Sequence, residues 1–152
     1  FSVLIGAQIF SNFVNLAGLP EALIAIVTAY DVSPFVVLLM ILGVYIILGC
    51  VFESLSMLLL TVPIFFPLVT SLGYDPIWFG IVVVVVTEIS LITPPVGLNV
   101  FILKAVVGNV STRTIFRGVT PFWIADIFRL ALIVLVPWLV LVLPNQMGAL
   151  GH

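Results

Sequence analysis

The stretch that decides the fold is Thr87–Asn99, which reads TEISLITPPVGLN. It lies between two apolar runs, Ile77–Val86 and Val100–Val107. Each run is too short to cross a bilayer alone, because a spanning helix needs about 20 residues. Pro94 and Pro95 remove two backbone donors, and their rings clash with the preceding helical turn. The sequence therefore predicts two half-helices separated by a break.

This discontinuous helix, residues 76–107, leaves backbone carbonyls and N–H groups at the break without helical partners. In hydrocarbon that is costly, so the break should be buried in protein or line a wet cavity. Carbonyls at the end of one half-helix suit Na⁺, and N–H groups at the start of the next suit an anion. Ser90, Thr93 and Asn99 add side-chain oxygens, and Gly97 permits an unusual backbone angle. We expect an ion or substrate site here; the alternative is a proline kink that only shapes a structural helix.

Composition places the chain in a lipid bilayer. Of its 152 residues, 64% are hydrophobic and 7% are charged, and the mean hydropathy is +1.48. A soluble domain is about 25% charged, so we predict an all-α integral membrane protein. The net charge of −2 and the lack of a basic patch argue against nucleic-acid binding. One cysteine, Cys50, and one terminal histidine, His152, provide no metal cluster and no catalytic triad. We expect neither an enzyme nor an organic cofactor.

Gly and Pro residues separate the segments that precede the broken helix. The chain begins inside an apolar run without an initiator Met, so we expect a piece of a longer protein. Residues 1–16 are predicted to end a membrane helix. Residues 20–31 form a short helix that either lies along the interface as an arm or is buried.

The segment of residues 34–72 is too long for one membrane span. Two full spans are doubtful, because its first apolar run, Phe35–Leu48, is shorter than a spanning helix. We favour a re-entrant hairpin with its tip near Gly49–Ser56, and a single long helix is the alternative. Glu53 is then either an intramembrane carboxylate with a function or the cap of the second hairpin helix, and these two roles are compatible.

The clearest span is the last transmembrane helix, predicted over 119–144, after a polar loop at Gly108–Gly118. Asp126 and Arg129 are three residues apart on its first turns and can pair. All four basic residues lie between Lys104 and Arg129. The positive-inside rule therefore places the loop in the cytoplasm. The acidic turn before the broken helix, residues 71–76, then faces outside.

A series of short motifs runs along the chain. In chain order they are Gly49-x-x-x-Glu53, Pro63-Ile64-Phe65-Phe66-Pro67, Gly73-Tyr74-Asp75-Pro76 with Phe79-Gly80, Thr93-Pro94-Pro95-Val96-Gly97 and Pro121-Phe122. In this order they resemble one family, the large membrane subunit of TRAP (tripartite ATP-independent periplasmic) transporters. The resemblance covers essentially the whole chain, as the C-terminal portion of that subunit. The Thr-Pro-Pro-x-Gly element is the more specific motif, and the Gly and Pro motifs are weaker.

The resemblance implies an inverted-repeat, elevator-type fold of which this chain is the second repeat: scaffold helix, arm, re-entrant hairpin, discontinuous helix and last helix. It implies a multi-pass permease of the bacterial inner membrane that imports organic acids, such as C4-dicarboxylates or sialic acid, with Na⁺. A periplasmic binding protein would deliver the substrate. A small membrane subunit and the missing N-terminal half of the same subunit would complete the permease.

The resemblance also implies a site at the hairpin tip and the helix break. The Na⁺ ligands would come largely from backbone carbonyls, at Gly49, Ser90, Thr93 and Val96. The chain departs from the family at Ser90, where Gly is more frequent, and a carbonyl ligand survives that change. Residues expected to contact substrate or shape the site are Glu53, Ser54, Pro94, Pro95, Gly97 and Asn99.

Three rival functions compete with this one. A related Na⁺- or H⁺-coupled anion transporter would work without a binding protein. An intramembrane aspartyl-type enzyme would need two carboxylates in one site, and only Glu53 and Glu88 could lie deep. A purely structural membrane subunit would not need the double-proline break.

Overall fold

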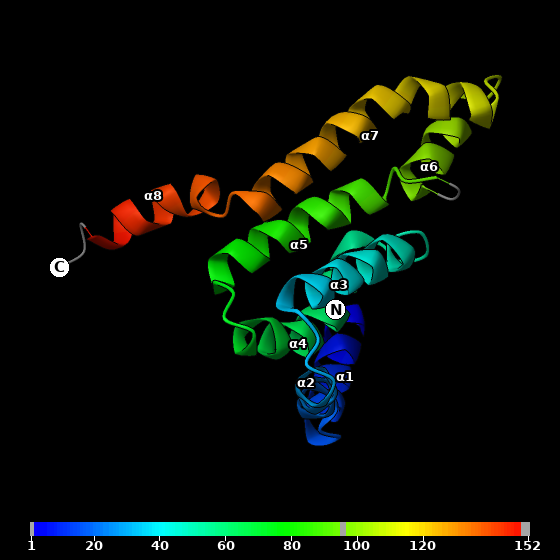
Figure 1. Cartoon of the computed structure of the whole chain (residues 1–152). Helices are drawn as coiled ribbons and strands as arrows, with labels where there is room; N and C mark the ends of the chain where they lie inside the picture. The colour runs from blue at the N-terminus through cyan, green and yellow to red at the C-terminus, as the bar shows by residue number, and fades with distance from the viewer. Residues whose placement is uncertain (1, 95–96, 150–152) are drawn as a thin grey trace.

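The computed structural model describes residues 2–94 and 97–149, and these residues form helices and no strand. Figure 1 shows the helices in chain order, each labelled at its place. Their bounds are α1 Ser2–Leu16, α2 Leu19–Ala29, α3 Pro34–Leu48, α4 Ser54–Ser71, α5 Pro76–Ser90, α6 Leu98–Val107, α7 Thr112–Leu135 and α8 Trp138–Ala149.

Prolines and acidic caps set where helices begin. Pro20, Pro34 and Pro76 each lie in the first turn of a helix, where the missing N–H has no intrahelical partner to lose. Asp75 caps α5, and its carboxylate accepts hydrogen bonds from the backbone N–H groups of Ile77 and Trp78, at 2.8 and 3.0 Å. The helix breaks that we expected at these Gly and Pro residues therefore fall between helices.

Length and composition allow α4 and α7 to cross a membrane. The pair Leu4–Leu16 and Leu19–Ala29 is bent by 48° and could form a third, broken span. Three apolar helices are shorter, namely α3, α5 and α6. An all-helical, apolar chain of this kind is consistent with the predicted membrane protein.

Helices α3 and α4 run antiparallel and are joined by residues 49–53, so the alternative of one long helix over 34–72 is excluded. Helix α5 lies centrally and packs on α3, α4 and α7. The core is built on its valines together with large residues of the hairpin, and its fully buried side chains include Tyr45, Met57, Trp78, Phe79 and Val86. The hairpin turn and the end of α5 therefore lie on the same side of the molecule (Figure 1).

The C-terminal part differs from the expected bounds. Helix α7 begins at Thr112, inside the segment predicted as a loop, because the Ser111 hydroxyl accepts a hydrogen bond from the Thr114 N–H and caps it. The expected single helix over 119–144 is interrupted after Leu135, since Pro137 cannot donate to the carbonyl of Ile133. Helix α8 then continues past Pro144, which was expected to end the helix.

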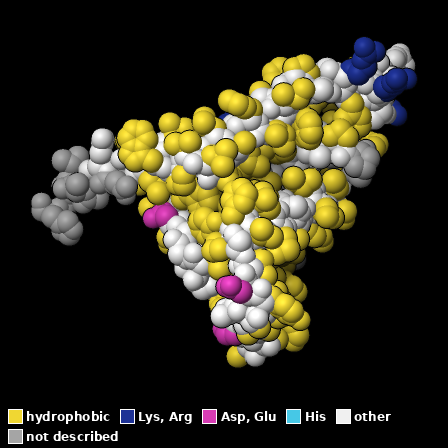
Figure 2. All heavy atoms as spheres, viewed as in Figure 1, with side chains coloured by type: hydrophobic (Ala, Val, Ile, Leu, Met, Phe, Trp, Pro, Cys, Tyr) yellow, Lys and Arg dark blue, Asp and Glu magenta, His cyan; other side chains and the backbone are white. Residues whose placement is uncertain are grey.

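Most basic side chains gather at one end of the molecule. Figure 2 shows Lys and Arg at the end where α6 meets α7, and the visible Asp and Glu at the left and on the lower part, away from that end. Lys104, Arg113 and Arg117 are all exposed at the basic end. Between the two, the visible surface is mostly apolar (Figure 2). The exposed side chains of α7 include Phe122 and Phe128. Such an apolar surface suits lipid or other membrane segments.

Candidate functional site at the hairpin tip and the helix break

The break in the discontinuous helix is the first part of the site. Helix α5 ends at Ser90 and α6 begins at Leu98. In a continuous helix the Leu91 carbonyl would accept from residue 95, but that residue is a proline and has no N–H. Instead it accepts from the backbone N–H of Asn99 at 3.1 Å. The chain therefore folds back at the break and replaces one hydrogen bond that the prolines removed.

Gly97 makes this return possible. Its φ of 54° lies in the left-handed region, where a side chain is strained. A Cβ there would also lie 3.3 Å from the carbonyl carbon of Ile92 and 3.4 Å from the backbone carbonyl oxygen of Thr93. The predicted site-shaping role of Gly97 thus has a geometric basis: it lets the start of α6 approach the end of α5.

The hairpin tip is the second part of the site, and it touches the first. Gly49, which follows α3, is buried, and a Cβ added to it would overlap the side chain of Ser90 at the end of α5. Among the described residues, no hydrogen bond reaches the Gly49 carbonyl. Gly49 and Ser90, which the family resemblance placed in one site and which are 41 positions apart (90 − 49), are therefore in contact.

The two hydroxyls of the break are buried and oriented. Ser90 is 0% exposed, and its hydroxyl donates to the Thr87 carbonyl at 2.6 Å. Thr93 is 8% exposed, and its hydroxyl donates to the Ile89 carbonyl at 2.7 Å. Both protons are thus used within the last turns of α5, which leaves oxygen lone pairs as the free functional groups.

Glu53 caps α4. Its carboxylate accepts from the N–H groups of Leu55 and Ser56 at 2.8 and 3.1 Å, and from the Ser56 hydroxyl at 2.9 Å. This confirms the capping role that the sequence offered as one alternative. The Ser56 hydroxyl adds the side-chain contact to this cap, and the site-shaping role of Ser54 stays a prediction. A part for Glu53 in ion coupling stays a prediction.

The remaining predicted residues are placed differently. Asn99 is exposed, and its backbone N–H donates to the Leu91 carbonyl across the break. A role for its side-chain oxygen stays a prediction. Pro94 is exposed and lines a cavity of about 170 Å³ with Ile92, Phe116, Val119, Thr120 and Trp123. Pro95 and Val96 lie outside the described residues.

Two polar contacts and one unpartnered hydroxyl near the site were not predicted. The Trp123 indole of α7 donates to the Thr93 hydroxyl at 3.0 Å. The Tyr45 and Thr61 hydroxyls, one on each arm of the hairpin, lie 2.7 Å apart. Within the described part of the chain, the buried Thr87 hydroxyl has no partner. No sequence pattern marks them, because each depends on how helices pack rather than on local spacing.

The donor set decides which ion these residues fit. Across residues 2–94 and 97–149, no group of three or more His, Cys, Asp or Glu side chains could hold a metal ion. The Gly49 carbonyl, the Ser90 and Thr93 hydroxyls and the unpartnered Thr87 hydroxyl are neutral oxygens. Oxygen ligands suit hard cations. The residues present are therefore compatible with a hard cation, of which Na⁺ is one.

Comparison with known proteins identifies the relatives. A family described as "Tripartite ATP-independent periplasmic transporter, DctM component" matches residues 1–139. The chain is 37% identical, over 96% of its length, to a C4-dicarboxylate TRAP transporter large permease protein of Pseudomonas aeruginosa. It is 32% identical, over 99% of its length, to the sialic acid TRAP transporter large permease protein of Vibrio cholerae.

A third relative, the isethionate TRAP transporter permease protein of Oleidesulfovibrio alaskensis, is 32% identical over 76% of the chain and 18% of that protein. The chain spans about a third of the length of the first two relatives, 34% and 35% respectively.

Proposed function

Because the chain belongs to the DctM family of tripartite ATP-independent periplasmic transporters, we propose that it forms the second repeat of a Na⁺-coupled permease subunit. The complete subunit imports an organic acid across the bacterial inner membrane, in an elevator-type movement of one inverted-repeat unit. A periplasmic binding protein delivers the substrate, and a small membrane subunit completes the permease. The printed substrates of the relatives, C4-dicarboxylates, sialic acid and isethionate, are all organic anions.

The observation that carries the Na⁺ proposal is the contact of Gly49 with Ser90. It puts the backbone of Gly49, whose carbonyl accepts no hydrogen bond among the described residues, against the buried side chain of Ser90 at the end of α5. Two irregular backbone segments meet there, namely the turn between α3 and α4 and the break between α5 and α6. Irregular backbone at membrane depth is tolerated where it is buried in protein or lines a cavity, which is where transporters place ion and substrate sites.

We assign the ion to the backbone carbonyls of Gly49, Ser90 and Thr93 and to the Thr93 hydroxyl, with Val96 as the further ligand expected from the family resemblance. Bound Na⁺ supplies a positive charge near the substrate anion and couples import to the Na⁺ gradient. The chain's own contribution is to hold these oxygens in place: Glu53 fixes the start of α4, and Gly97 holds α6 against the break. The N-terminus of α6 carries the positive end of a helix dipole and favours a carboxylate nearby.

The test is uptake by the complete permease, with its small subunit, in proteoliposomes. Labelled C4-dicarboxylate, sialic acid and isethionate are each offered with the matching binding protein, under an inward Na⁺ gradient or an equal K⁺ gradient. We expect uptake of one of these anions that needs both Na⁺ and the binding protein. Uptake that needs Na⁺ but not the binding protein would favour the related anion transporter. Equal uptake with K⁺ would refute Na⁺ coupling.

A further inference from the structure

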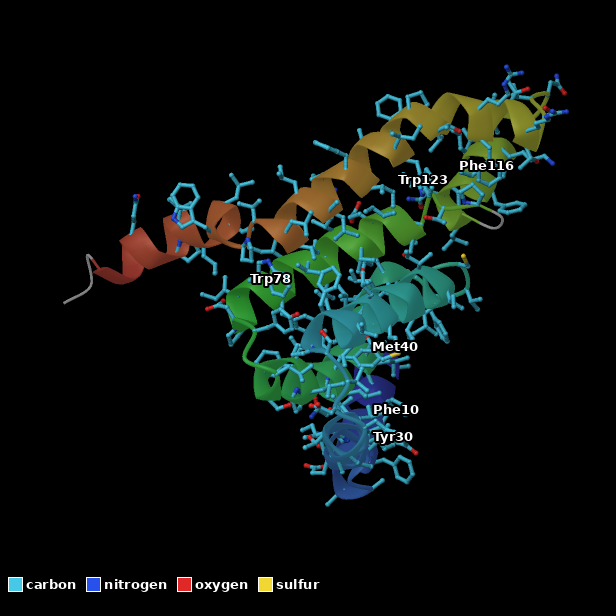
Figure 3. The ribbon with its side chains drawn as sticks, viewed as in Figure 1. Phe10, Tyr30, Met40, Trp78, Phe116 and Trp123 are labelled. Atoms are coloured by element: carbon cyan, nitrogen blue, oxygen red, sulfur yellow. The ribbon has the colours of Figure 1, made fainter. Side chains whose placement is uncertain are left out.

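Two tryptophans connect α7 to α5 and its break, one at each end of the helix pair (Figure 3). At the start of α5, the Trp78 indole donates to the Ile133 carbonyl at 2.9 Å. Near the break, the Trp123 indole donates to the Thr93 hydroxyl at 3.0 Å. Both bonds have the same donor chemistry and join segments distant in sequence, but they end on different kinds of acceptor.

The bond of Trp78 has a structural explanation. The Ile133 carbonyl would normally accept from the N–H of residue 137, which is a proline and has none. Trp78 supplies the missing donor to a carbonyl that would otherwise be buried without a partner, which is costly. Its role is therefore to complete the backbone hydrogen bonds of α7.

The bond of Trp123 has no such explanation, because the Thr93 hydroxyl already donates to the Ile89 carbonyl at 2.7 Å. A hydroxyl carries one proton and two lone pairs. The proton is used by Ile89 and one lone pair by Trp123, so one lone pair remains. Its direction is fixed by the other two bonds, one from α5 and one from α7.

We infer that Trp123 is a positioning residue of the proposed Na⁺ site: its indole orients the Thr93 hydroxyl so that the remaining lone pair faces the ion. The inference rests on the proposed function, since it requires Na⁺ to bind at the break. Hydrogen bonds from outside a metal site commonly fix the orientation of its ligands and tune affinity. Trp123 also makes α7 part of the site, although α7 contributes no ligand.

The surroundings of Trp123 make a clean substitution possible. Its ring is half-buried and lines the cavity of about 170 Å³ beside Pro94 and Phe116. The Trp123→Phe variant therefore removes the indole donor next to an existing space, without forcing a larger group into the core. Trp78→Phe is the matched control, because it removes an indole bond between the same elements at the opposite end of α5.

The experiment measures the rate of substrate uptake against Na⁺ concentration for the complete permease in proteoliposomes. We expect Trp123→Phe to raise the Na⁺ concentration for half-maximal uptake about three- to tenfold, as for the loss of one net hydrogen bond. The maximal rate at saturating Na⁺ should be largely kept. Trp78→Phe should lower the yield of folded protein and leave the half-activating Na⁺ concentration unchanged. Trp123→Leu also lacks the donor and replaces Trp123→Phe if that variant does not fold.

A double variant asks whether Trp123 acts through Thr93. Thr93→Val keeps the shape of the side chain and removes the acceptor. It should raise the half-activating Na⁺ concentration, and adding Trp123→Phe should raise it no further. Additive shifts of the half-activating Na⁺ concentration in the double variant would overturn the inference. So would equal Na⁺ curves for Trp123→Phe and Trp78→Phe. As long as the wild type depends on Na⁺, either result leaves the proposed function standing. A wild type that ignores Na⁺ would overturn the proposed function and the inference with it.

Discussion

Gly49 at the hairpin tip lies directly against the side chain of Ser90 at the end of α5, with no room between them for a Cβ. Both residues are buried, and the chain between them includes the whole of α4 and α5 up to its last residue, Ser90. The position therefore demands glycine for a tertiary reason, since its φ of −67° is open to any residue. Because the two irregular segments are in contact, a movement of the hairpin tip toward α5 would displace Ser90 at the helix break.

Gly49→Ala should impair uptake strongly. The added methyl group must displace Ser90, and overpacking of this kind costs about 1–3 kcal/mol. Gly43→Ala is the control, because Gly43 lies in α3, the helix that precedes Gly49, with nothing within 4 Å of the added Cβ. The measurement is uptake by equal amounts of folded permease. Adding Ser90→Gly to Gly49→Ala should restore part of the activity, and no restoration would mean that Ser90 is not the group displaced.

Glu53→Gln should keep partial uptake, since the amide oxygen can still accept from the N–H groups of α4. Glu53→Ala should lose more, because it removes the acceptor altogether. Asp75→Asn makes the same change at the cap of α5, away from the break. Complete loss of uptake in Glu53→Gln, with normal folding and a tolerant Asp75→Asn, would instead indicate that the charge of Glu53 balances the ion.

Several local features were predictable from the sequence because their causes are local. Proline and glycine positions set the helix ends, Glu53 precedes the helix that it caps, and Asp126 and Arg129 are three residues apart. The expected ion pair is confirmed, with 3.1 Å between Arg129 Nη2 and Asp126 Oδ1. The start of α7 was missed because its first turns are polar and lack an apolar period, although Ser111 is a typical capping residue.

The remaining features depend on packing between helices. The contact between Gly49 and Ser90 was expected only through the family resemblance, since spacing along the chain does not specify which helices meet. The bond from Trp123 to Thr93 joins residues on different helices, and an indole within an apolar run resembles any membrane-facing aromatic residue. Asn99 was predicted for its side-chain oxygen. The structure shows that its backbone N–H donates to the Leu91 carbonyl, which Pro95 cannot do.

Single cysteines at Tyr74 and Ser111 should react with membrane-impermeant reagents from opposite sides of the membrane. The basic end of the molecule, with Arg113 and Arg117, should face the cytoplasm, and the turn before α5 should face outside. The free Cys50 is replaced by serine in both variants to remove background labelling. Labelling of both positions from the same side would contradict the assignment of 76–107 as one broken span.

Thr93→Ala should weaken activation by Na⁺ without abolishing uptake, since it removes one hydroxyl and leaves the carbonyl ligands. Thr28→Ala is the control: the Thr28 hydroxyl also donates to a backbone carbonyl four residues earlier, but it lies on α2, away from the break. The measurement is the half-activating Na⁺ concentration. An equal shift in both variants would show that the effect is a general one on folding or insertion.

The most direct test of the ion site is the Na⁺ dependence of uptake after Pro94 and Pro95 are both replaced by alanine. Alanine restores two backbone donors and the highest helix propensity, so the chain can draw the carbonyls of the break back into helical hydrogen bonds. For the complete permease with its small subunit and binding protein in proteoliposomes, we predict a large loss of Na⁺ activation, greater than for Thr93→Ala. A double variant that folds and keeps the wild-type Na⁺ dependence would show that the break is only a kink, and would contradict the assignment of the ion to it.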